Sequence, residues 1–187
     1  MSTSEKPCFG RSARSIAASA YPKERSTRSV AGSRWCRPSR RRTSSTASWS
    51  PAPAQRARGP VRDLVAVYQS LLDHDERLLP AELSRQMIAR QREGMFDETF
   101  KQTVDWGWGL KLDSKRYGKP ETYGYGAHAS DQTFGHSGNQ CGCAFADPEH
   151  QLVVAWVVNG MPGEPKHQAR QEAINTAIYE DLDLAGQ

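Results

Sequence analysis

A seven-residue apolar run near the end of the chain, residues 152–158 (Leu-Val-Val-Ala-Trp-Val-Val), places the strongest constraint on the fold. Every position is apolar, so a strand formed by this run must be covered on both faces. Turn-forming residues stand on either side of the run, at positions 147–150 and 159–160. We therefore expect a central strand with packing elements on both sides of its sheet.

Two shorter segments before this run also predict strands. Residues 133–138 read Thr-Phe-Gly-His-Ser-Gly, and residues 141–146 read Cys-Gly-Cys-Ala-Phe-Ala. Glycine within a strand weakens it but allows a ligand or another backbone to approach closely. The whole region therefore predicts strand, strand, turn and strand, with the polar pair His136-Ser137 beside glycines.

The remaining pattern is mostly helical. Apolar spacing predicts one helix over residues 61–73, a second from near Pro80 to before Gly94, and a last helix from about Pro165. Leucines and methionines of the first two helices are expected in the core. Residues 105–112 alternate and predict a further strand. The buried stripe predicted for the last helix is Ala169, Ala173, Ile174, Ala177, Ile178 and Leu182. The fold class is thus α+β, an antiparallel sheet flanked by helices.

Charge divides the chain in two. The first 60 residues hold 13 of the 25 Lys and Arg residues but two of the 21 acidic ones. Residues 1–58 are rich in Ser, Arg and Pro without sustained apolar periodicity, which predicts a disordered basic segment. Three interpretations remain open for it: a solvated tail, a nucleic-acid contact through the basic residues 37–42, or an out-of-frame translation. Residues 59–187 form the predicted folded domain.

The chain also carries motifs of a known family. These are Trp-Gly-Trp-Gly at 106–109, Phe-Gly-His-Ser-Gly at 134–138, Ala-Phe-Ala-Asp-Pro at 144–148 and Asn-Gly at 159–160. Together they resemble the C-terminal part of serine β-lactamase and penicillin-binding-protein-like hydrolases, which include DD-peptidases and class C or esterase-type enzymes. The triplet His136-Ser137-Gly138 matches the family's Lys-Thr-Gly motif on the strand that lines the active site.

This resemblance implies roles for four consecutive residues. His136 stands where the family often has lysine, a positive group that holds the substrate and assists proton transfer. Ser137 would donate to a substrate carboxylate or carbonyl, which makes His136 and Ser137 the candidate catalytic residues. Gly138 would allow close approach, and the backbone N–H of Asn139 would be an oxyanion-hole donor. These two are the candidate substrate-binding residues.

Two other family motifs are missing. The nucleophile is the serine of Ser-x-x-Lys, and none of the seven lysines of this chain has serine three positions before it. The Tyr-x-Asn or Ser-x-Asn motif matches only residues 137–139, which overlap the triplet. The sequence therefore predicts a truncated serine hydrolase that is inactive as given. The alternative is a non-catalytic binding protein, either a pseudoenzyme or a nucleic-acid binder through the basic tail.

The remaining expectations concern ligands and location. Cys141 and Cys143 lack the further ligands a metal site needs, so they are expected to be free thiols, and no metal or cofactor is expected. The aromatic segments 106–109 and 123–126 are candidates for a site rim, although such side chains more often pack. The expected partner is a small-molecule ester, amide or β-lactam, with no membrane or nucleic-acid partner. Since no signal peptide or membrane span is visible, the default location is cytoplasmic.

Overall fold

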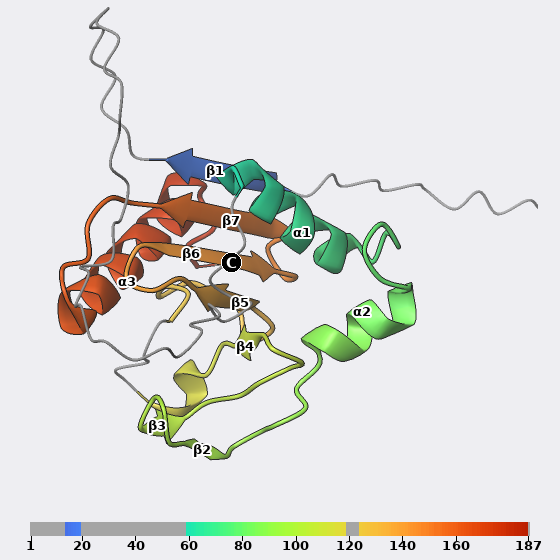
Figure 1. The fold of residues 1–187 in the computed structure, drawn as a ribbon, viewed down its shortest axis with the longest axis horizontal. Coiled ribbons are helices and arrows are strands. Elements are labelled where there is room, and N and C mark those ends of the chain that lie inside the picture. Colours follow the sequence, from blue (N-terminus) through green and yellow to red (C-terminus); the bar gives the residue numbers. More distant parts are fainter. Residues whose placement is uncertain (1–13, 20–58, 119–123, 187) are drawn as a thin grey trace, which may run out of the picture. The chain divides into compact units, whose positions relative to one another are not determined.

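The computed structural model describes residues 14–19, 59–118 and 124–186, which form a sheet with helices on both faces (Figure 1). The helices are α1 (Val61–Asp73), α2 (Ala81–Ile88) and α3 (Glu164–Asp181), with a short 3₁₀ turn, η2 (Lys115–Tyr117). The strands are β1 (Arg14–Ser19), β2 (Phe96–Asp97), β3 (Gln102–Thr103), β4 (Lys111–Leu112), β5 (Phe134–Ser137), β6 (Gly142–Asp147) and β7 (Leu152–Val157). None of the helices in these ranges is long and apolar enough to cross a membrane.

The main sheet has the order β1-β7-β6-β5-β4. Strands β4 to β7 pair antiparallel, as the predicted fold class requires. Strand β1 pairs with β7 in parallel, so β7 lies between two neighbours. Strands β2 and β3 form a separate two-stranded sheet.

The predicted covering of β7 on both faces is confirmed. Its residues alternate between two apolar clusters: Val153 and Ala155 belong to the cluster under α1, while Leu152 and Val154 belong to the cluster under α3. Phe134 of β5 lies in the α1 cluster. The sheet is therefore buried on both sides, and β5 is held between β6 and the short strand β4.

The side of α3 that faces the sheet differs from the predicted one. The buried residues recur at every fourth position and are mainly polar: His167, Gln171, Asn175 and Tyr179. Of the predicted stripe, Ala169, Ala173 and Ala177 are exposed, while Ile174, Ile178 and Leu182 are half-buried. Ile174, Ile178 and Leu182 pack against the apolar cluster under α3, so the prediction is wrong only for the three alanines. The polar residues are buried because the sheet surface under α3 offers them hydrogen-bond partners, which an apolar stripe would leave unpaired.

Two further expectations need correction. Leu64 of α1 and Leu83 of α2 are exposed rather than buried. Residues 105–112 do not form one strand, since only Lys111–Leu112 is extended in the sheet. The chain turns at Gly107, whose N–H donates to the carbonyl oxygen of Leu110 at 2.9 Å. A Cβ at Gly107 would collide with the carbonyl oxygen of Met87 at the end of α2. Only glycine therefore fits where the chain passes this helix end.

The predicted disordered segment also needs a partial correction. Residues Arg14–Ser19 of the segment 1–58 form β1, the strand beside β7. A segment that lacks its own amphipathic pattern can still add a strand to an existing sheet edge through backbone hydrogen bonds. The rest of the segment, including the basic residues 37–42, lies outside the described residues.

Candidate functional site

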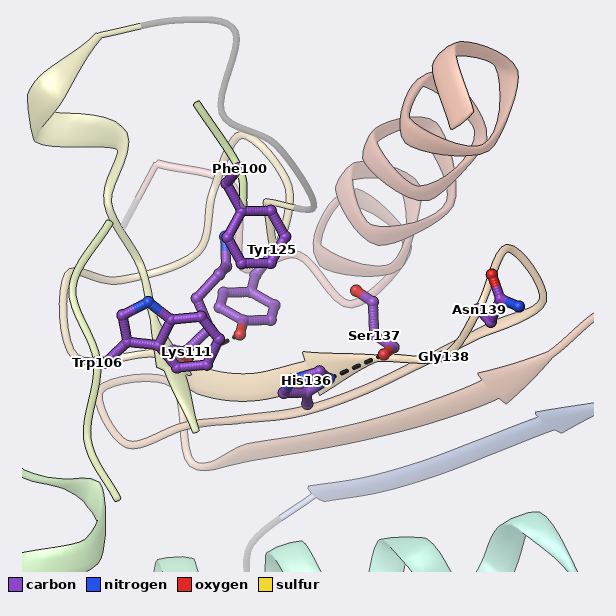
Figure 2. Close-up of a pocket in the computed structure, with 8 residues that line it drawn as sticks. All are labelled: Phe100, Trp106, Lys111, Tyr125, His136, Ser137, Gly138 and Asn139. Atoms are coloured by element: carbon purple, nitrogen blue, oxygen red, sulfur yellow. Dashed lines mark hydrogen bonds between the residues drawn. The ribbon is translucent and has the colours of Figure 1, made fainter. Parts of the chain in front are cut away.

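A cavity of about 140 Å³ lies at the end of β5 (Figure 2). Its walls come from three parts of the chain: β5 with the turn after it, the segment around β4 and Tyr125, and the β2–β3 region. The lining residues are Phe100, Trp106, Lys111, Tyr125, His136, Ser137, Gly138 and Asn139. All four predicted site residues are therefore brought to one cavity.

Strand β5 reaches this cavity because it packs tightly against β6. A Cβ on Gly135 would lie 2.6 Å from the Cβ of Phe145 and would also strike the carbonyl oxygen of Ala144. No larger residue fits there. Gly135, rather than Gly138, is thus the glycine that the fold itself requires.

His136 is exposed at the mouth of the cavity. Its Nδ1 lies 2.8 Å from the carbonyl oxygen of Ser137, and because a carbonyl only accepts, Nδ1 carries the proton. In the neutral ring Nε2 is then the acceptor. The ring lies 6.0 Å from that of Trp106, centroid to centroid. His136 thus stands at the rim with one nitrogen available to a ligand.

Ser137 projects to the other face of β5, toward α3 (Figure 2). Its Oγ donates to Oε1 of Gln171 at 3.0 Å. Gly138 closes the following turn, with its N–H donating to the carbonyl oxygen of Gly142 at 2.7 Å. A Cβ at Gly138 would meet nothing nearer than 3.6 Å, so it would make only ordinary van der Waals contacts with the turn. The N–H of Asn139 has no hydrogen-bond acceptor among the described residues.

Lys111 and Tyr125 form a second wall; Tyr125 belongs to a segment proposed above as a site rim, whereas Lys111 had no functional assignment. Lys111 is only 3% exposed, and its Nζ lies 5.1 Å from the centroid of the Tyr125 ring, a cation–π contact. The Tyr125 hydroxyl donates to the carbonyl oxygen of Lys111 at 2.9 Å. A buried ammonium in a cavity wall favours carbonyl or carboxylate groups of a ligand. The available signal was a lysine between Leu110 and Leu112, a charge at a position that apolar neighbours predict to be buried.

Phe100 and Trp106 form the aromatic wall, with ring centroids 5.9 Å apart. Asp97 holds both: one carboxylate oxygen accepts the backbone N–H of Phe100 at 3.1 Å, and the other accepts Nε1–H of Trp106 at 3.1 Å. Burial by itself would raise the pKa of Asp97, but these hydrogen bonds and Arg92 lower it below its usual value. An ionised Asp97 therefore fixes the aromatic wall.

Cys143 lies under the site, opposite Ser137 in the ladder between β5 and β6. Burial raises the pKa of its thiol to about 12, so it stays protonated. Cys143 and Cys141 are both free thiols, as expected. Among residues 14–19, 59–118 and 124–186, no group of three or more His, Cys, Asp or Glu side chains could hold a metal ion.

Comparisons with known proteins concern the family and the fold of this chain. A family model described as Beta-lactamase matches residues 10–178, which is most of the chain and includes β1. A solved β-lactamase from Mycobacterium bovis is similar in fold, with a TM-score of 0.54 and 22% identity over 66% of this chain and 44% of that one. No curated protein matches the sequence.

Two weaker structural similarities accompany it. A novel penicillin-binding protein homologue from Caulobacter crescentus has a TM-score of 0.41 and 27% identity, over 59% of this chain and 30% of that one. EstA from Arthrobacter nitroguajacolicus Rue61a has a TM-score of 0.45 and 19% identity, over 69% of this chain and 33% of that one. The chain thus spans less than half the length of each of these three structures.

Proposed function

Because the chain belongs to the β-lactamase family, we propose that it carries the ligand-binding wall of a serine hydrolase without the nucleophile. In this proposal it is part of such a hydrolase and binds a small ester, amide or β-lactam without acyl-enzyme turnover. The observation that carries the proposal is the single cavity wall made by His136, Ser137, Gly138 and Asn139.

The polarity of the cavity supports this class of ligand. The buried ammonium of Lys111 and the N–H of Asn139 are both donors, and an ester, amide or β-lactam offers carbonyl oxygens to them. The rings of Phe100 and Trp106 add an apolar wall on which a planar or aromatic substituent can pack. Gly138 lines the cavity without a side chain, so its backbone can contact a ligand directly.

The lack of a base that could activate a nucleophile supports the proposal that no turnover occurs. The sequence holds no Ser-x-x-Lys, and the one serine in the cavity wall, Ser137, donates its proton to the neutral amide of Gln171. An amide oxygen is too weak a base to take that proton away. His136 contacts the carbonyl oxygen of Ser137 and not its hydroxyl, so it does not act as the base either.

Benzylpenicillin tests both parts of the proposal, since it carries a β-lactam amide, a carboxylate and an aromatic group. We expect reversible NMR shift changes at the cavity residues and an unchanged intact mass after incubation. Lys111→Met should weaken binding by about tenfold, the effect of losing one charge-assisted contact. Lys166→Met is the matched control, because Lys166 is an exposed cation on α3 and its removal should leave binding unchanged.

Either of two results would contradict the proposal. A mass increase equal to one penicilloyl group would show that a nucleophile is present after all. Equal weakening by the Lys111 and Lys166 substitutions, or no shift changes at saturating ligand, would show that the cavity is not the binding site.

A further inference from the structure

The polar face of α3 joins two walls of the cavity through one side chain. Gln171 is fully buried, and its amide makes two hydrogen bonds. Oε1 accepts the hydroxyl of Ser137 at 3.0 Å, and Nε2 donates to the carbonyl oxygen of Gly124 at 3.0 Å. Gly124 precedes Tyr125, so the same amide contacts β5 and the segment that carries the opposite wall.

These partners fix the orientation of the amide. The carbonyl of Gly124 can only accept a hydrogen bond, so the NH₂ group of Gln171 must face it. Asn175, one turn further along α3, also donates to this carbonyl oxygen, at 3.3 Å. The oxygen of the Gln171 amide is therefore the atom that faces Ser137, and Ser137 must be the donor.

We propose that Gln171 is a positioning residue: it accepts the hydrogen bond from the hydroxyl of Ser137. Ser137 therefore offers a lone pair, and not a proton, to a ligand in the cavity. A serine hydroxyl has one proton and two lone pairs. With the proton held by Gln171, the oxygen meets the ligand as an acceptor. This inference rests on the proposed function, since it specifies which ligand group lies at Ser137.

The surroundings of Ser137 leave this arrangement intact. The neighbouring thiol of Cys143 stays protonated, because burial raises its pKa to about 12, so no thiolate competes for the hydroxyl proton. A thiol can occupy at most one lone pair, and the other remains for a ligand. The wall thus has donors at Lys111 and Asn139 and an acceptor at Ser137. Its complement is a group with a carbonyl and an adjacent N–H, as in an amide rather than an ester.

Two neutral, isosteric probes isolate this acceptor. Benzamide and acetophenone share the ring and the carbonyl, and differ in NH₂ against CH₃. We expect the wild-type protein to bind benzamide about fivefold more tightly, the value of one net hydrogen bond, measured as a ratio of dissociation constants by NMR titration. Gln171→Met, which keeps the shape but frees the hydroxyl to rotate, should bring this ratio close to one.

Two further variants separate positioning from general packing. Gln171→Glu, in its protonated form, retains an oxygen acceptor for Ser137 and an O–H donor for the carbonyl oxygen of Gly124, and should keep the preference for benzamide. Thr176→Val removes a different α3 anchor of the same segment, the bond from the N–H of Ala127 to Oγ1 at 3.0 Å, and should also keep it. A ratio unchanged by Gln171→Met, or a wild-type preference for acetophenone, would overturn the inference.

If neither probe binds, a measurement on the ligand-free protein tests the inference. Hydroxyl exchange at Ser137, followed by the deuterium isotope shift on its Cβ, should be about tenfold slower in the wild-type protein than in Gln171→Met. Equal exchange rates would overturn the role of Gln171. Slow exchange together with no binding of either probe would instead count against the proposed function alone. The wild-type rate, compared with that of a solvent-exposed serine peptide, gives the same decision if the Met variant does not fold.

Discussion

Replacing Asp147 with asparagine should lower the free energy of unfolding by about 4 kcal/mol, because its buried carboxylate joins several parts of the fold. Asp147 is the last residue of β6 and is fully buried. One oxygen accepts Ser130 Oγ–H at 2.6 Å and the N–H of Glu149 at 3.1 Å. The other accepts the N–H of Ser130 at 2.9 Å, the Tyr179 hydroxyl at 2.7 Å and Nδ1 of His150 at 2.9 Å.

The expected loss of free energy depends on which of these donors can instead accept a hydrogen bond. Asparagine replaces one oxygen with NH₂, and in either orientation this group faces a backbone N–H, of Ser130 or of Glu149, that can only donate. The charge that strengthens the other hydrogen bonds is also lost. Hydrogen bonds to a charged group contribute about 1.5–3 kcal/mol each, so the loss of two gives about 4 kcal/mol.

Urea unfolding followed by circular dichroism measures this change. Asp131→Asn is the control, since Asp131 is exposed and should change the free energy of unfolding by less than about 0.5 kcal/mol. A loss below about 1 kcal/mol for Asp147→Asn, with an unchanged slope of the transition, would refute the view that Asp147 holds these segments together.

Three other predictions concern pH, packing and reactivity. Burial would raise the pKa of Asp147, but bonds from Ser130, Tyr179 and His150 outweigh it and lower that pKa. Its contribution should therefore be complete above about pH 4 and be lost as the pH falls further, so the urea midpoint should fall more steeply below that pH than in Asp147→Asn. Gly135→Ala should lower the free energy of unfolding by about 2 kcal/mol or more through its collision with β6, whereas Gly138→Ala, whose Cβ would make only ordinary van der Waals contacts, should change it little. With a thiol pKa near 12, Cys143 should resist iodoacetamide at about pH 8 until the protein is unfolded, as read by peptide mass spectrometry; rapid labelling of the native protein would contradict this.

The order and pairing of β5, β6 and β7 followed from local sequence. An apolar run with turn residues on both sides has few ways to satisfy its backbone and bury its side chains, and hairpin neighbours are also neighbours in the chain. The same locality explains the candidate site. His136, Ser137, Gly138 and Asn139 are consecutive, so the end of β5 and the turn after it place them next to one another in one wall of the cavity.

Contacts between segments far apart in the sequence determined the other cavity walls and the buried face of α3. Lys111 and Phe100 entered the site only because separate parts of the chain fold against β5, and no spacing in the sequence links them to His136. The buried face of α3 was set in the same way: Gln171 and Asn175 are buried because Ser137, Gly124 and Trp156 offer hydrogen bonds there. Apolar periodicity records only which side chains avoid water. Which polar side chains can leave water depends on partners that the tertiary structure supplies.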